Sequence, residues 1–82
     1  PMTELAQPTP NELLDVTGLK CPMPILRTKK ALANMASGAI LQIRATDPAT
    51  REDFAAFARQ TGHELLQLVE TDGSLVFYLK RK

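Results

Sequence analysis

The chain has 82 residues, 44% of them hydrophobic, and a formal net charge of +1 at pH 7. This length suffices for one domain, which would bury about 60–65% of the surface of its extended chain. The single cysteine excludes an internal disulfide, and with it a disulfide-bonded secreted scaffold. No apolar run approaches the roughly 20 residues that span a bilayer. Because the first residues also lack the apolar segment of a signal peptide, we expect a cytoplasmic protein without membrane contact.

The first half of the chain predicts an arm, a strand, a helix and a second strand. Residues 1–11 contain three prolines and no periodicity, which predicts a flexible N-terminal arm before a folded domain of residues 12–82. Alternating apolar residues predict strands over Leu13–Thr17 and Ala39–Thr46. Gly38 ends the helix between them. Residues at helical spacing predict that helix: Ile25, Thr28, Leu32 and Met35.

The next element is a second helix, which has two candidate starts. Thr50 and Asp53 form a capping-box pattern, in which each side chain bonds a backbone N–H of the first turn. Asp47-Pro48 offers an alternative cap with proline at the first helical position. Gly62 ends the helix in either case.

Two further strands complete the predicted fold. A strand is expected over His63–Glu70, Asp72-Gly73 is a hairpin signal, and apolar residues then alternate along the last strand. The order is βαβαββ. It predicts an α+β fold, a two-layer α/β sandwich in which two helices cover one face of a four-stranded mixed sheet. Since aromatic residues are scarce, we expect an aliphatic core.

The run from Lys20 to Pro24 contains the only cysteine, between a glycine-terminated strand and a helix. We expect Cys21 at the N-cap position of that helix, with Pro22 and Pro24 at positions where a missing N–H breaks no helical bond. The N–H groups of Met23 and Ile25 would then be free to face the sulfur. Such a cradle favours an anion at Cys21.

Neighbouring charges strengthen this expectation. A thiol at a helix N-terminus, beside Lys20 and within reach of Arg27, should have a lowered pKa, and the same site would stabilise an anionic persulfide. The alternative is that Cys21 is a small buried hydrophobe, as most free cysteines are. A buried cysteine has no need of two flanking prolines, so we predict an exposed reactive thiol.

Charge is unevenly distributed along the chain. No acidic residue lies between Asp15 and Asp47. This interval contains five basic residues: Lys20, Arg27, Lys29, Lys30 and Arg44. They form either a solvated helix face or a basic rim around Cys21 that stabilises an anion or meets an acidic partner.

The segment Asp15–Pro24 resembles the opening of the TusA/SirA family of sulfur-carrier proteins, which have a Cys-Pro-x-Pro motif. The resemblance extends over residues 13–82. Further matching blocks follow in the same order: Lys29–Leu32, Thr46–Pro48, Gly62–Leu65 and Asp72-Gly73. The resemblance implies a βαβαββ sandwich, which agrees with the fold predicted from the residues.

The resemblance also implies a function. In that family the motif cysteine accepts sulfane sulfur as a persulfide, typically from a cysteine desulfurase, and passes it to an acceptor protein. By resemblance, Cys21 is the carrier, Pro22 and Pro24 shape its loop, and Asp47 is an accessory polar group. Members tied to transfer RNA thiolation commonly have Glu where this chain has Met23. This difference weakens the link to transfer RNA thiolation without excluding it, and molybdenum-cofactor enzymes and sulfur metabolism are the other open destinations.

Other residues are assigned structural roles. His63 is far from Cys21 in the sequence and is expected to be structural. One cysteine and one histidine offer no paired ligand spacing for zinc, so we expect no metal. Met23 and Leu26 could form an exposed apolar docking patch, whereas Met35 is assigned to the core.

Two other functions compete with that of a sulfur carrier. The basic segment 20–44 could belong to a regulatory or nucleic-acid-binding module, but no aromatic residues are interleaved for base stacking. A dithiol redox cycle needs a second cysteine, which the chain lacks. We predict a monomeric sulfurtransferase that acts without a cofactor as a stoichiometric relay between a donor and an acceptor protein.

Overall fold

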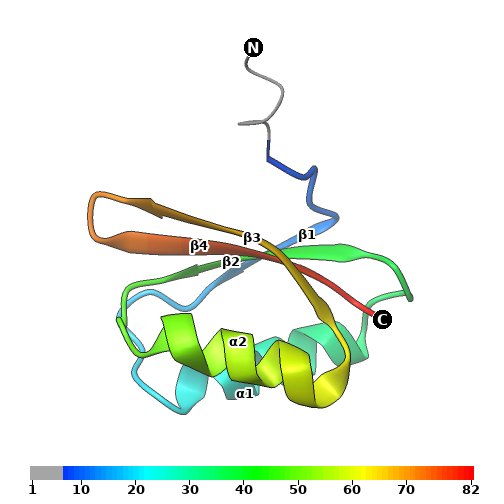
Figure 1. The fold of residues 1–82 in the computed structure, drawn as a ribbon, viewed down its shortest axis with the longest axis horizontal. Helices are drawn as coiled ribbons and strands as arrows, with labels where there is room; N and C mark the ends of the chain where they lie inside the picture. Colours follow the sequence, from blue (N-terminus) through cyan, green and yellow to red (C-terminus); the bar gives the residue numbers. More distant parts are fainter. Residues whose placement is uncertain (1–6) are drawn as a thin grey trace.

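The computed structural model describes residues 7–82 (Figure 1). Its elements follow the predicted order: β1 (Glu12–Asp15), α1 (Met23–Ala33), β2 (Ile40–Ala45), α2 (Thr50–Thr61), β3 (Glu64–Thr71) and β4 (Ser74–Lys80). The four strands form one sheet in the order β1-β2-β4-β3. β1 pairs with β2 in parallel, and β4 pairs antiparallel with both β2 and β3. The predicted fold class is confirmed.

Figure 1 shows both helices on the same face of the sheet. The pattern of β2 explains this arrangement, because Leu41, Ile43 and Ala45 are fully buried while Arg44 is exposed on the other face. Parallel strands need a crossover connection, which α1 supplies between β1 and β2. The sheet and the helix layer therefore enclose one core between them.

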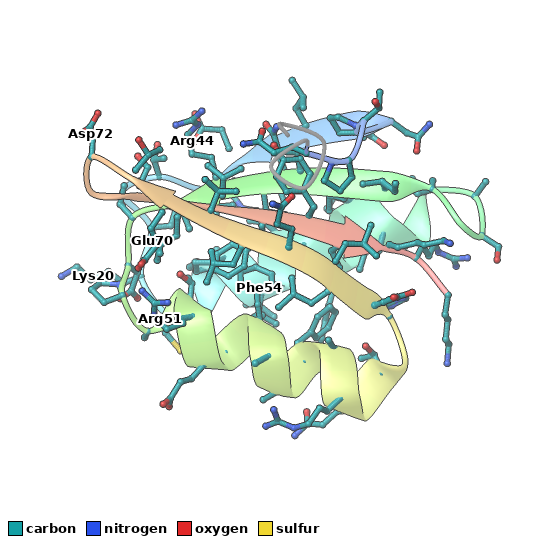
Figure 2. All side chains as sticks on the ribbon, turned by 45° about the horizontal axis from the view of Figure 1, so that its top comes forward. Lys20, Arg44, Arg51, Phe54, Glu70 and Asp72 are labelled. Atoms are coloured by element: carbon teal, nitrogen blue, oxygen red, sulfur yellow. The ribbon has the colours of Figure 1, made fainter. Side chains whose placement is uncertain are left out.

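The centre of this core is aromatic. Phe54 of α2 and Phe77 of β4 are both fully buried, and their ring centroids lie 4.6 Å apart. Phe57, one helical turn later, is 6% exposed and packs edge-on against Phe54. The expectation of an aliphatic core was therefore wrong at its centre. Figure 2 shows Phe54 in the space between α2 and the sheet.

The predicted element boundaries hold to within a few residues, except that α1 ends at Ala33 with Asn34 as its C-cap and not at Gly38. β1 covers Glu12–Asp15, although Val16 still donates its N–H to the Arg44 carbonyl at 2.8 Å. The hairpin between β3 and β4 turns at Asp72 and Gly73, whose φ angles of 47° and 80° are both left-handed. Two successive left-handed residues define the tight turn that Asp-Gly favours, so the hairpin prediction is confirmed.

Residues 1–6 of the expected arm lie outside the described residues. The part that follows contacts the sheet: the Tyr78 hydroxyl donates to Oε1 of Gln7 at 2.7 Å. Asn11 donates its backbone N–H to the Ile40 carbonyl and accepts the Ile40 N–H at its side chain, both at 2.8 Å. No helix within residues 7–82 has the length and apolar character needed to cross a membrane.

Candidate functional site

Cys21 is exposed in the loop between β1 and α1. The helix begins at Met23, Pro22 is its N-cap, and the Cys21–Pro22 peptide bond is cis. Cys21 thus precedes the N-cap instead of occupying it. The Met23 N–H donates to the Lys20 carbonyl at 2.9 Å, so it is not free to face the sulfur. The predictions of Cys21 at the N-cap and of a free Met23 N–H facing the sulfur were therefore wrong.

Asp47 holds the backbone of Cys21 in place. It lies between β2 and α2, and its Oδ2 accepts the Cys21 N–H at 3.0 Å. Its Oδ1 accepts the N–H of Ala49 at 3.1 Å. These two bonds lower the pKa of the Asp47 carboxyl, and the positive charge of Lys20 adds to the effect. Asp47 is therefore a carboxylate that joins the cysteine loop to the start of α2.

The same turn decides between the two predicted starts of α2. The helix begins at Thr50 and its N-cap residue, Ala49, has no side-chain cap. The capping box of Thr50 with Asp53 was therefore wrong, and the alternative at Asp47-Pro48 describes the turn that leads into the helix. The Thr50 hydroxyl donates to the Asp47 carbonyl at 2.6 Å, which ties this turn together.

Asp53 lies beside the thiol. The pKa of Cys21 is raised above its ordinary value, first by a hydrogen bond with the Asp53 carboxylate. Partial desolvation and the negative charges of Asp53 and Asp47 raise it further. The expectation of a lowered pKa was wrong, because the hydrogen bond with Asp53, partial burial and the charges of Asp53 and Asp47 all disfavour the thiolate. The sequence pattern of Thr50 and Asp53 predicted a helix cap, so it did not indicate that Asp53 lies at the site.

A cavity of about 220 Å³ extends from Cys21 between the two helices. Its lining is Cys21, Pro22, Ile25, Lys29, Asp53, Ala56, Phe57 and Gln60. One wall is thus α1 and the other is α2. The thiol stands at a small cavity lined by apolar residues of both helices and by the polar side chains of Lys29, Asp53 and Gln60.

The five basic residues of the segment 20–44 do not form one surface. Figure 2 shows Arg44 on the face of the sheet away from the helices, and Lys20 beside the start of α2. Arg27 is exposed on α1 and does not line the Cys21 cavity. Of the five, Lys29 alone lines that cavity. A nucleic-acid-binding module would need a continuous basic surface, which this distribution does not provide.

The remaining sequence candidates do not line the Cys21 cavity. Met23 and Leu26 are 37% and 48% exposed, whereas Met35 is 8% exposed and belongs to the core. His63 accepts the backbone N–H of Lys82 at Nδ1, 3.1 Å away, and its ring packs on Phe57. Residues 7–82 contain no group of three or more histidine, cysteine, aspartate or glutamate side chains that could hold a metal ion.

Fold and site together define a small α/β sandwich whose chemistry is that of a single exposed thiol. The profile of the sulfurtransferase TusA family matches residues 12–81. A candidate sulfur carrier protein of Neisseria meningitidis serogroup A is 56% identical over 72 residues, which cover 88% of this chain and 97% of that protein. The sulfur carrier protein TusA of Allochromatium vinosum is 52% identical over 68 residues, which cover 83% of this chain and 90% of that protein.

A solved structure agrees with these relatives. The crystal structure of a SirA-like protein from Desulfitobacterium hafniense matches with a TM-score of 0.76 and 25% identity, over 84% of this chain and 95% of that chain. The chain belongs to the TusA family, and the resemblance seen in its sequence is confirmed.

Proposed function

We propose that the chain carries sulfane sulfur as a persulfide on Cys21, taken from a cysteine desulfurase or a similar donor and passed to an acceptor protein. The observation that carries this proposal is the exposure of the only cysteine at the mouth of the cavity between α1 and α2. Relatives named as sulfur carriers support it.

The chemistry of loading needs no further reagent. The Cys21 sulfur forms a bond to the terminal sulfur of the donor persulfide while the S–S bond of the donor breaks. The sulfur that leaves keeps the electron pair of that bond and takes up the proton that Cys21 gives. One thiol and one persulfide are thus exchanged for another thiol and another persulfide, with no net oxidation. Delivery is the same exchange with Cys21 as the donor: the acceptor thiol attacks the terminal sulfur of the Cys21 persulfide, and Cys21 leaves as the thiol.

The loop residues have distinct roles in this proposal. Pro22, Met23 and Pro24 set the path of the loop that exposes the sulfur, and Asp47 fixes its backbone through the Cys21 N–H. Lys20 in the loop and Arg27 on α1 are exposed and supply positive charge for an approaching partner. The protein acts as a monomeric cytoplasmic co-substrate between enzymes. Transfer RNA thiolation, molybdenum-cofactor enzymes and sulfur metabolism are all destinations that fit this role.

One incubation tests the proposal. The chain is mixed with a cysteine desulfurase, cysteine and pyridoxal phosphate, and its intact mass is then measured. We expect the wild type to gain the mass of one sulfur atom, and a reductant to remove that mass again. Cys21→Ser should gain none. If wild type and Cys21→Ser behave alike with every sulfane donor tried, the carrier function is excluded.

A further inference from the structure

The side chain of Asp53 does not form a capping hydrogen bond in its own helix. It is half-buried in the first turn of α2, and the cap of that helix has no side-chain bond. Within residues 7–82 the one ion pair joins Arg51 to Glu70, whose labelled side chains Figure 2 shows near the start of α2. Asp53 instead lines the cavity at whose mouth Cys21 stands.

We propose that Asp53 keeps Cys21 in the thiol form while the carrier is free, and that a sulfur partner activates it by bringing a cationic side chain to Asp53. This inference rests on the proposed function, since it concerns how the same thiol is loaded.

The two carboxylates near the sulfur are not equivalent. Asp47 already accepts two backbone N–H groups and lies near Lys20, so its charge is largely compensated within the fold. Asp53 accepts no hydrogen bond from a backbone N–H or a basic side chain among the described residues. A carboxylate next to a thiol disfavours the thiolate, which is the form that attacks sulfur. Asp53 is therefore the charge that a partner must neutralise.

The other charged groups around the cavity do not perform this task. Lys29 lines the cavity from α1 but forms no ion pair with Asp53, and Lys20 is associated with Asp47. The pKa of Cys21 is raised first by the hydrogen bond with Asp53, then by partial burial and by the charges of Asp53 and Asp47, and neither lysine is among the causes. A partner that covers the cavity also excludes water, which strengthens any cation–carboxylate pair formed there.

The rate of Cys21 alkylation by iodoacetamide, measured as a function of pH, tests the first part. Asp53→Asn should shift the profile to lower pH. Its rate at neutral pH should rise by about threefold for each unit of the shift, because a tenfold gain in thiolate is offset by weaker nucleophilicity. Asp53→Glu keeps the carboxylate and should stay close to wild type. Glu52→Gln is the matched control, since it removes one negative charge from an exposed neighbouring position outside the cavity.

An unchanged profile in folded Asp53→Asn, or an equal shift in Glu52→Gln, overturns the inference. If Asp53→Asn does not fold, the ultraviolet absorbance of the wild-type thiolate decides. Its titration midpoint should lie at higher pH in the folded chain than in the same chain in denaturant. An equal or lower midpoint contradicts a role of the fold in protecting the thiol.

The partner cation is tested by sulfur loading. If the desulfurase supplies a cation to Asp53, loading of Asp53→Asn should stay level or fall although its alkylation is faster. If the loading rate of Asp53→Asn rises by the same factor as its alkylation rate, the proposed partner cation is refuted. The two proposals fail separately: a wild type that takes up no sulfur refutes the carrier function, whereas a wild type that does, with an unchanged alkylation profile in Asp53→Asn, refutes only the role of Asp53.

Discussion

At the scale of single residues, the link between Asp47 and Cys21 decides where the thiol stands. The two residues are 26 positions apart, yet the Asp47 carboxylate receives the Cys21 N–H at 3.0 Å. The other oxygen of the same carboxylate holds the turn before α2. A single side chain therefore fixes the loop of one element to the start of another.

Removing this link should loosen the Cys21 loop. In Asp47→Ala the Cys21 N–H loses its acceptor, and we expect its hydrogen exchange to accelerate about tenfold, the effect of losing one ordinary hydrogen bond. Amide exchange measured residue by residue by nuclear magnetic resonance checks this. Asp15→Ala is the control, because the Asp15 carboxylate accepts the Thr17 N–H and no bond from Cys21. Unchanged exchange at Cys21 in Asp47→Ala would mean that the bond does not persist in solution.

The sequence predicts this site only in part, and the reason is visible in Asp53. The motif locates Cys21, and the family resemblance points to Asp47. Asp53 could not be found, because its contact with Cys21 depends on how α2 packs beside α1 and leaves no local pattern. Its spacing from Thr50 instead matches a helix cap. The protonation preference of the thiol was missed for the same reason.

At the scale of elements, the end of α2 is joined to the end of the chain. Gly62 closes the helix in the left-handed conformation, with φ of 88°. His63 then packs on Phe57 and accepts the Lys82 N–H. Burial, with the charges of Lys82 and Arg81, lowers the pKa of His63 below its ordinary value of 6.5.

This shift makes stability depend on pH. The unfolded chain binds a proton at His63 at higher pH than the folded chain does, so the free energy of unfolding rises with pH in that interval. The stabilisation is complete above pH 6.5 and is lost as the pH falls through the folded-state pKa. Urea unfolding of wild type and His63→Gln at neutral and mildly acidic pH measures it. We expect a smaller loss in His63→Gln, and equal losses in both would remove His63 as the cause.

The order of elements was easier to predict than their ends. Alternating apolar residues in β2 and the Asp72-Gly73 turn are local signals that determine strand and hairpin directly. The start of α1, in contrast, is not determined by a local sequence signal. Two prolines suit several positions of a first turn, and the choice is made by the bond between the Met23 N–H and the Lys20 carbonyl.

At the scale of the whole molecule, Phe54 connects the layer that carries the site to the sheet. Phe54→Ala should lower the free energy of unfolding by about 3–5 kcal/mol. That is a large fraction of the roughly 5–15 kcal/mol that stabilises a small domain. Urea unfolding measures the difference. Leu13→Ala is the control, since Leu13 is 69% exposed and its loss should change stability by less than about 0.5 kcal/mol. A comparable loss in both variants would contradict the assigned core.

The acidic groups beside Cys21 affect which molecules in a cell can react with its sulfur. Asp53 lines the cavity at Cys21, so small thiols and oxidants that are themselves anions meet a like charge beside this sulfur, whereas a cationic side chain of a partner protein is attracted to that carboxylate. The carboxylates therefore favour reaction of the sulfur with protein partners over reaction with small anionic thiols. In the proposed carrier, we expect the sulfane sulfur on Cys21 to transfer slowly to small anionic thiols and quickly to proteins that fit the cavity.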